Sequence, residues 1–229
     1  PTFNSVDIHA NTYYHTVYSH SSSPTFTDCS WTDNHQWYYG ALFADDNTNL
    51  TLSNSSFIGN SSDGVAGALY AEGVGTSVTV TGTLFEGNTG THGGAVEVYY
   101  PGGNLTFRDN TFVDNEASVS GGAIYVAGAT RALFADNVIQ DNTAADDGGG
   151  VFLAPAARTS WLGNLVLSNS ASDLGGGMYL ADNTTTLLTG NVVAFSDNGA
   201  GIHGGTAVNQ RMWANHNNVF DNFDGDLEP

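Results

Sequence analysis

Aspartates beside glycine-rich segments are the first residues in this sequence that could do chemistry. Asp146, Asp147, Asp173 and Asp197 each follow a recurring polar residue, usually Asn, and precede a run of glycines. Carboxylate oxygens are the ligands that Ca²⁺ prefers in proteins. If these segments stack in space, the four side chains converge and form a calcium site. The alternative interpretation is that they are solvated turn residues, because Asp is common in turns.

A second set of candidate residues is mainly aromatic. Each member directly follows an apolar residue in a short β-like segment, so the alternation of side chains along a strand directs it outward. Exposed rings with a polar group stack well on sugars, but rings on any β face also stack on one another. We therefore expect an aromatic stripe that serves either glycan binding or structural packing. The stripe comprises Phe43, Tyr70, Glu97, Tyr125, Phe152, Tyr179 and His203.

The charge balance restricts the classes of partner. Among 229 residues, 23 are acidic and four are Arg or Lys, which gives a formal charge of −19. Nucleic acid is excluded as a partner, because phosphate neutralisation needs clustered cations, and binding to an anionic membrane surface is disfavoured. Cys29 is the single cysteine, so no intrachain disulfide can form. No apolar run approaches membrane-spanning length, and a start at Pro1 leads us to expect part of a longer chain.

The elements that position these residues follow from an internal repeat. The pattern of an aromatic or aliphatic residue, two further residues and then Asn, as in Phe57–Asn60, returns every 23 to 28 residues along the chain. A second apolar column lies eight residues before each Asn. After each Asn, a short turn leads to a strand that begins with Gly-Gly-Ala or similar small residues. Repeats of this length indicate a solenoid. The recurring positions of the first column are Asn11, Asn34, Asn60, Asn88, Asn115, Asn142, Asn169, Ser196 and Asn222.

A leucine-rich repeat has a similar period, so the rest of the repeat decides the fold. Here the remainder is rich in Gly, which costs about 1 kcal/mol per helical position, and it shows no 3.6-residue period. Strand-like alternation is clear in the segments 77–80 and 104–107. The sequence therefore predicts an all-β fold, a right-handed parallel β-helix of about nine coils of about 27 residues each. We expect Asn side chains to bridge coils at the bends and apolar columns to fill the interior.

Two of the repeats resemble a known family closely. Gly93-Gly-Ala-Val96 with Phe85…Asn88, and Gly121-Gly-Ala-Ile124 with Phe112…Asn115, match the repeat pair of the chlamydial polymorphic membrane proteins. Other coils match one half of the pair, and the resemblance spans roughly residues 26–222. Similar repeats occur in many bacterial surface and secreted β-helix proteins. The resemblance implies an autotransporter-passenger-like adhesin that is secreted or lies at the cell surface.

Pectin-degrading lyases and hydrolases share this type of fold, so an enzyme is the alternative function. Arg131, Arg158 and Arg211 occupy one repeat position, and we expect surface pairing with acids such as Asp136 rather than catalysis. The segment 201–204, Gly-Ile-His-Gly, departs from the Gly-His-Gly of polygalacturonase-like hydrolases, and without Lys their Arg-Ile-Lys motif is impossible. The turns are too short to wall a substrate cleft. We assign no catalytic residue.

The prediction is thus a non-catalytic β-helix scaffold that presents a long face to a glycan or to a partner protein, with Ca²⁺ as its one candidate cofactor. A secreted polysaccharide lyase or hydrolase is the first alternative, and a structural segment of a filament or fibre is the second. We expect residues 1–25 to form an irregular first coil or cap, residues 26–222 the repeats, and residues 223–229 the start of a further coil or a linker.

Overall fold

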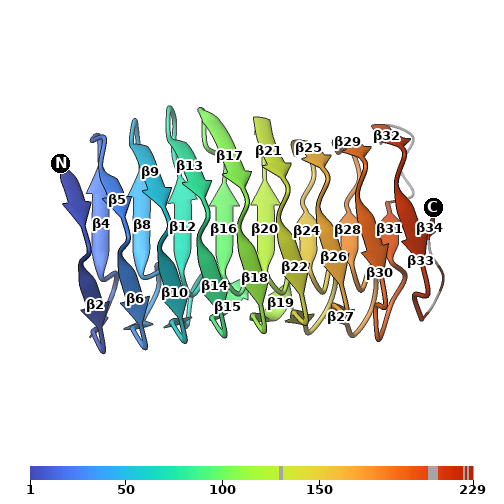
Figure 1. Ribbon diagram of the computed structural model, residues 1–229, viewed down its shortest axis with the longest axis horizontal. Coiled ribbons are helices and arrows are strands. Elements are labelled where there is room, and N and C mark those ends of the chain that lie inside the picture. The colour runs from blue at the N-terminus through green and yellow to red at the C-terminus, as the bar shows by residue number, and fades with distance from the viewer. Residues whose placement is uncertain (129–130, 206–210, 224, 226, 229) are drawn as a thin grey trace.

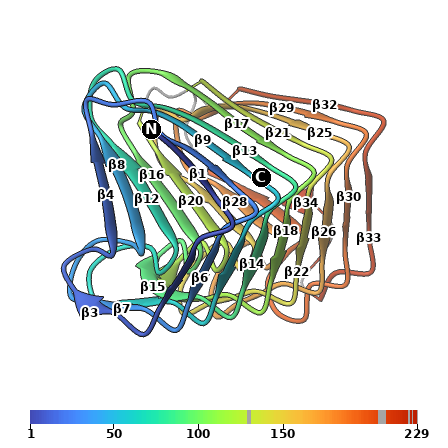
Figure 2. The same ribbon diagram turned by 60° about the vertical axis from the view of Figure 1, so that its left-hand side comes forward.

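The chain winds into a rod of parallel coils (Figure 1). The computed structural model describes the chain except residues 129–130, 206–210, 224, 226 and 229. Each coil passes through up to four short strands, and equivalent strands of successive coils pair in parallel to form four sheets, which we name A to D. Figure 2 shows these sheets running along the length of the rod. The predicted all-β parallel β-helix is confirmed.

Sheets A and B follow each other in every coil and each contain nine strands. Sheet A consists of β1 (Thr2–Asn4), β5 (Thr25–Thr27), β9 (Asn49–Ser53), β13 (Ser77–Thr81), β17 (Asn104–Arg108), β21 (Arg131–Ala135), β25 (Arg158–Leu162), β29 (Thr185–Thr189) and β32 (Arg211–Asn215). Sheet B consists of β2 (Asp7–His9), β6 (Ser30–Thr32), β10 (Ser56–Ile58), β14 (Leu84–Glu86), β18 (Thr111–Val113), β22 (Val138–Gln140), β26 (Leu165–Leu167), β30 (Val192–Ala194) and β33 (Asn218–Phe220).

Sheets C and D complete the coil with seven and nine strands. Sheet C consists of β3 (Thr12–Tyr13), β7 (His35–Gln36), β11 (Ser61–Ser62), β15 (Thr89–His92), β19 (Glu116–Ser120), β23 (Thr143–Ala144) and β27 (Ser170–Ala171). Sheet D consists of β4 (Val17–His20), β8 (Leu42–Asp45), β12 (Leu69–Glu72), β16 (Val96–Tyr99), β20 (Ile124–Ala127), β24 (Val151–Leu153), β28 (Met178–Leu180), β31 (Ile202–Gly204) and β34 (Leu227–Glu228).

Nine strands in a sheet correspond to eight complete turns between the first and the last strand, close to the predicted nine coils. Residues 1–25 contribute β1 to β4 and the first residue of β5, so the expected irregular first coil pairs in register with the second. Within the segment 223–229, β34 pairs in parallel with β31. The rest of that segment lies partly outside the described residues, namely at positions 224, 226 and 229.

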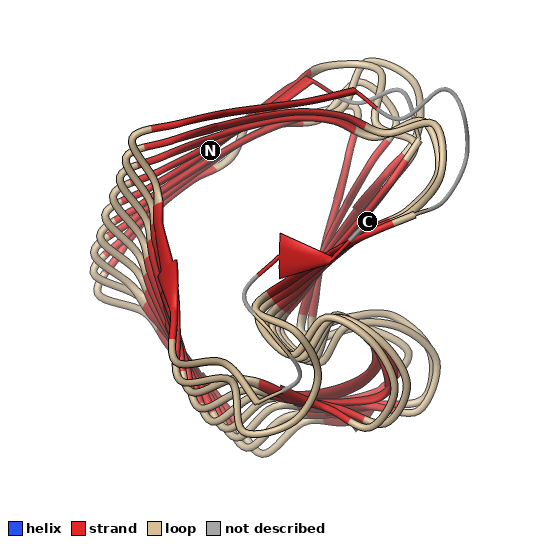
Figure 3. Ribbon diagram, turned by 90° about the vertical axis from the view of Figure 1, so that its right-hand side faces the viewer, coloured by secondary structure: helices blue, strands red, loops and turns tan. Residues whose placement is uncertain are grey.

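The interior is one continuous apolar column enclosed by sheets A, B and D, and the chain bends outward through sheet C before it returns to sheet D (Figure 3). Phe57, Phe85 and Phe112 stack on successive coils with ring centroids 5.2 and 4.7 Å apart. The predicted inward column of sheet D is buried throughout, with each member at most 2% exposed. This column runs through Leu42, Leu69, Val96, Ile124, Val151, Met178 and Ile202.

Asparagines bridge the coils at two of the bends, as predicted. The B–C ladder lies between sheets B and C, and from Asn11 to Asn142 each side-chain Nδ2 donates a hydrogen bond to the Oδ1 of the asparagine on the next coil. The A–B ladder lies between sheets A and B and repeats the arrangement. The B–C ladder comprises Asn11, Asn34, Asn60, Asn88, Asn115, Asn142 and Asn169. The A–B ladder comprises Asn110, Asn137, Asn164, Asn191 and Asn217.

The paired glycines before sheet D have two distinct roles. Gly121 adopts a φ of +71°, which favours Gly over residues with a Cβ. The adjacent Gly122 has no space for a side chain, because a Cβ there would collide with the carbonyl oxygen of Gly149 on the next coil. The Gly-Gly-Ala motif therefore lets the backbone turn sharply and lets adjacent coils approach closely.

Candidate functional site

The outer face of sheet A gathers all the permanent positive charge of the side chains. The four arginines, Arg108, Arg131, Arg158 and Arg211, all lie in strands of sheet A, and the chain has no Lys. The described strands of this sheet contain no Asp, Glu or His. All 23 acidic residues thus lie outside the sheet. The described strands of sheet A therefore carry only positive side-chain charge, on a protein that is acidic as a whole.

Strand register sets the arginines in one line. Alternation along β17, β21 and β25 buries the second and fourth side chains of each strand and directs the first and third outward. The first outward column is Asn104, Arg131, Arg158, Thr185 and Arg211. A neighbouring outward column is Thr106, Leu133, Ser160, Leu187 and Trp213, and it ends in an indole that is 54% exposed. Both columns run along the rod.

Arg131 and Arg158 differ from Arg108 in their contacts. Asp136 was expected to pair with an arginine of this column, but its carboxylate instead lies 2.7 Å from the guanidinium of Arg108. Within the described part of the chain, no ion pair includes Arg131 or Arg158. Arg131 and Arg158 are partners on adjacent strands, which lie about 4.8 Å apart, and like charges at that separation repel each other by roughly 1 kcal/mol in water.

The two arginines border a depression in the surface. It has a volume of about 480 Å³ and spans β17, β21 and β25. Hydroxyl, amide and guanidinium groups alternate around it with the side chain of Leu133. The lining residues are Asn104, Leu105, Thr106, Arg131, Ala132, Leu133, Arg158, Thr159 and Ser160. The arrangement offers hydrogen-bond donors and positive charge to a ligand.

The predicted aromatic stripe forms one column on sheet D, but three of its seven members are buried. Its members pair in register from Phe43 to His203, and Tyr18, which sequence reasoning missed, precedes Phe43. Phe43, Tyr70 and Glu97 are only 4 to 5% exposed, and Tyr39, in the turn between sheets C and D, packs over Phe43 and Tyr70. These three side chains are therefore not available as a ligand surface.

The rings in the rest of the stripe cover one another. Tyr125 and Phe152 lie 5.1 Å apart, Phe152 and Tyr179 5.0 Å, and Tyr179 and His203 5.4 Å, with planes within 11° of parallel. The ring faces, which a sugar would contact, are thus occupied by neighbouring rings. The geometry favours the structural interpretation of this stripe.

We expect the double substitution Y125A/Y179A to lower stability without changing glycan binding. Both rings are half-buried, so each truncation should cost about 1–3 kcal/mol in the free energy of unfolding. Urea denaturation measures this loss, and a glycan array measures binding. Tyr99→Ala, at an exposed ring of the same sheet, is the control and should cost less. A variant of unchanged stability that no longer binds glycans would return the stripe to the candidate ligand sites.

The predicted calcium residues do not meet. No three of Asp146, Asp147, Asp173 and Asp197 bring carboxylate oxygens within 4.8 Å of one another. Asp147 is half-buried, and one of its oxygens accepts a hydrogen bond from the backbone N–H of Leu174 at 3.1 Å. Burial raises the pKa of Asp147 above its usual value, with Asp173 and Asp146 adding to the rise. The other three carboxylates are exposed, which agrees with solvated turn residues.

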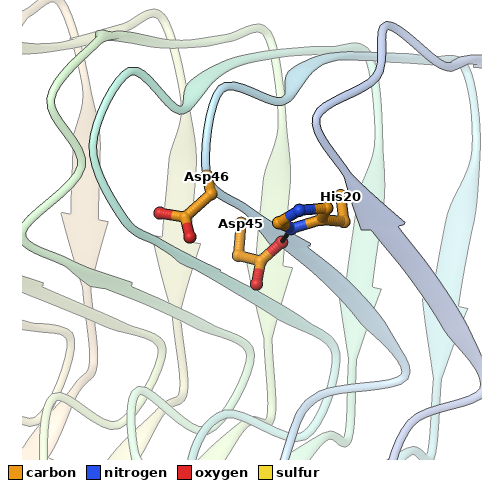
Figure 4. A group of neighbouring side chains, drawn as sticks. All are labelled: His20, Asp45 and Asp46. Carbon is orange, nitrogen blue, oxygen red and sulfur yellow. Dashed lines mark hydrogen bonds and ion pairs between the residues drawn. The ribbon is translucent and has the colours of Figure 1, made fainter.

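A different cluster of titratable groups lies where strands of sheet D end (Figure 4). His20, Asp45 and Asp46 bring ligand atoms within 4.8 Å of one another, the one such group among the described residues. The carboxylate of Asp45 accepts a hydrogen bond from the hydroxyl of Tyr18 at 2.9 Å and lies 2.8 Å from Nδ1 of His20. Because both oxygens of Asp45 have partners, the cluster is accounted for as a polar contact between β4 and β8.

Comparison with known proteins agrees with this architecture. The profile of the family described as the right-handed beta helix region matches residues 1–139, which is more than half of the chain. The match is to the family as a whole and does not single out the chlamydial proteins that the repeats resemble. Searches of curated proteins and of solved structures returned no match. The described residues include no helix with the length and hydrophobicity needed to cross a membrane. By its repeats, its stacked sheets and this match, the chain belongs to the right-handed β-helix family.

Proposed function

We propose that this protein is a non-catalytic scaffold that presents the outer face of sheet A to an extended glycan. The observation that carries the proposal is the segregation of charge: sheet A holds all four arginines, and its described strands hold no acidic residue. Stacked coils keep this face regular over nine strands. A rigid, elongated surface of this kind suits a polymer that lies along the rod.

The side chains on this face favour a glycan over a partner protein. Thr106, Ser160 and Asn104 offer hydroxyl and amide groups, which can hydrogen-bond to sugar hydroxyls. Trp213 offers an exposed ring for stacking on a sugar. The buried centre of a stable protein interface is mostly apolar and poor in charged residues, whereas the depression lined by Arg131 and Arg158 mixes charged, polar and apolar side chains. An adhesin-like role outside the cell or at its surface belongs to the same proposal and is supported by the resemblance of the repeats to bacterial surface proteins.

Blocking sheet A tests this proposal. Cys29 is buried, at 2% exposed, so a cysteine introduced at an exposed position reacts selectively with a polyethylene-glycol maleimide. We expect the N104C conjugate, modified beside the depression, to lose binding on an array of neutral and acidic polysaccharides. The matched T143C conjugate, modified on the exposed surface of sheet C, should bind like the unmodified protein.

Two results would contradict the proposal. One is an array on which the unmodified protein binds no polysaccharide. The other is equal binding by the two conjugates, which would place the ligand on a different face. Circular dichroism of both conjugates verifies that the β-helix stays folded during the comparison.

A further inference from the structure

Arg131 and Arg158 form a pair of like charges with no acidic partner among the described residues. They are directly opposite each other on β21 and β25, and both side chains are exposed. Like charges in this position destabilise a sheet. An anion held between the two guanidinium groups converts this repulsion into attraction. Because guanidinium groups bind carboxylate, sulfate and phosphate through paired N–H donors, the pair has the chemistry of an anion site.

The surroundings of the pair match a sugar acid better than a free ion. Thr106 and Ser160 place hydroxyls on either side of Leu133, in the column beside the arginines. A sugar ring has the same mixture, with hydroxyls at its edge and apolar C–H groups on its faces. The open depression of about 480 Å³ spans three strands and therefore has more room than one small anion needs.

The column of arginines also indicates the direction in which a bound polymer would lie. Arg211 follows Arg158 in the same column after the intervening Thr185, two coils further along the rod. The coil spacing of about 4.8 Å is close to the length of one sugar residue in an extended chain. A polymer that lies parallel to the axis can therefore place its acidic groups against Arg131, Arg158 and Arg211. Leu187 and the ring of Trp213 lie beside this path.

We propose that sheet A binds an acidic polysaccharide, with a carboxylate or sulfate group held between Arg131 and Arg158. This inference rests on the proposed function and adds the class of glycan to it. The high overall negative charge does not prevent such binding at physiological salt, where the Debye length is about 8 Å. Under those conditions the distant carboxylates are screened, whereas direct contacts with the arginines are not.

Charge-removing variants test the inference, and the chain supplies its own control. R131Q/R158Q removes the proposed anion site, whereas R108Q removes an arginine of the same sheet that already pairs with Asp136. The probes for isothermal titration are an oligogalacturonate, a sulfated oligosaccharide, a neutral glucan of the same length and poly-glutamate. We expect R131Q/R158Q to bind the acidic oligosaccharides at least about tenfold more weakly than the wild type, and R108Q to bind them within twofold of it.

Three outcomes would overturn the inference: unchanged affinity of R131Q/R158Q for the acidic oligosaccharides, wild-type binding of the glucan as tight as that of oligogalacturonate, or equally tight binding of poly-glutamate. If R131Q/R158Q binds normally while the N104C conjugate is still blocked, sheet A remains the binding face and only the anion site is wrong. Thermal stability is measured in parallel: R131Q/R158Q should be at least as stable as the wild type, because it removes the repulsion between like charges, and R108Q should lose no more than about 1 kcal/mol with its exposed ion pair.

Discussion

Replacing Asn115 with Ala lowers the free energy of unfolding by about 3–5 kcal/mol, because its side chain makes four buried hydrogen bonds between coils. Its Oδ1 accepts from the backbone N–H and from Nδ2 of Asn88 at 3.0 and 2.9 Å. Its Nδ2 donates to the carbonyl of Phe85 at 3.0 Å and to Oδ1 of Asn142 at 2.9 Å. Truncation leaves several buried polar groups short of a partner, at about 1–3 kcal/mol each.

The substitution N115D is expected to cost more than N115A, although Asp is nearly the same size as Asn. Both positions contacted by Nδ2 are oxygen acceptors, the carbonyl of Phe85 and Oδ1 of Asn142. A carboxylate has no N–H to donate to them, and desolvation penalises its buried charge. Protonation of the introduced carboxyl restores one donor. The loss should therefore be smaller at pH 4 than at pH 7.

Urea denaturation followed by far-UV circular dichroism measures both losses. The matched control is N104A, which truncates an exposed asparagine of the neighbouring sheet and should change the free energy of unfolding by less than about 0.5 kcal/mol. If N115D is as stable as N115A at pH 7, the donor role that the ladder assigns to Nδ2 is wrong.

The ladder was predictable from sequence because periodicity alone defines it. In a stack of coils of nearly equal length, residues at equal repeat positions lie over one another, so a column of Asn must contact itself. The columns through Phe57 and Phe107 followed by the same reasoning, and the strand registers agree with them. Sequence therefore predicts which residues share a column and which face of a strand they occupy.

Periodicity did not predict which outward-facing side chains are buried under another part of the coil. Phe43 and Tyr70 occupy outward positions, yet they are buried because the chain between sheets C and D packs over them. Tyr39, in that connection, stacks on Phe43 at 4.2 Å. The connection returns over sheet D because of the conformation of its turn. Turn residues have no periodic pattern, so the sequence does not indicate this conformation.

The surface of sheet A shows a different limit. The sequence placed Arg131, Arg158 and Arg211 in one column, but it gave no distances to acids, so Asp136 was assigned to the wrong arginine. The absence of Asp and Glu from the strands of this sheet becomes visible only after the strand bounds are known. The ion-pair partner of a charged side chain at a bend can be identified only from coordinates. A shift of one residue in the position of the bend would direct the carboxylate to another side of the coil.

Replacing Glu97 with Gln should stabilise the protein above neutral pH, by up to about 5 kcal/mol at pH 9. Glu97 is 5% exposed, and its Oε2 has no hydrogen-bond partner among the described residues. Burial, with a smaller contribution from Glu72, raises the pKa of Glu97 from 4.5 to about 8. One pKa unit corresponds to about 1.4 kcal/mol, so this pKa shift gives the upper limit of about 5 kcal/mol for the gain in the free energy of unfolding. Tyr70 and Tyr125 flank the carboxyl on the adjacent strands.

The direction of the pH dependence follows from the raised pKa. Below about pH 4.5 the carboxyl is protonated in both the folded and the unfolded chain, so it does not change stability with pH. Between about pH 4.5 and pH 8 the unfolded chain loses its proton while the folded protein keeps it, and stability falls as the pH rises. Above about pH 8 the carboxyl is ionised in both states, and the full cost of a buried charge remains.

The variant E97Q keeps the shape of the side chain and removes this titration. Urea midpoints of wild type and E97Q, measured from pH 4.5 to pH 9, should therefore diverge steadily and then stay parallel above about pH 8. E116Q, which neutralises an exposed glutamate of sheet C, should follow the wild type throughout. A constant difference between wild type and E97Q across this range would mean that Glu97 is ionised in the folded protein at acidic pH, and that water or a cation reaches the centre of the covered stripe.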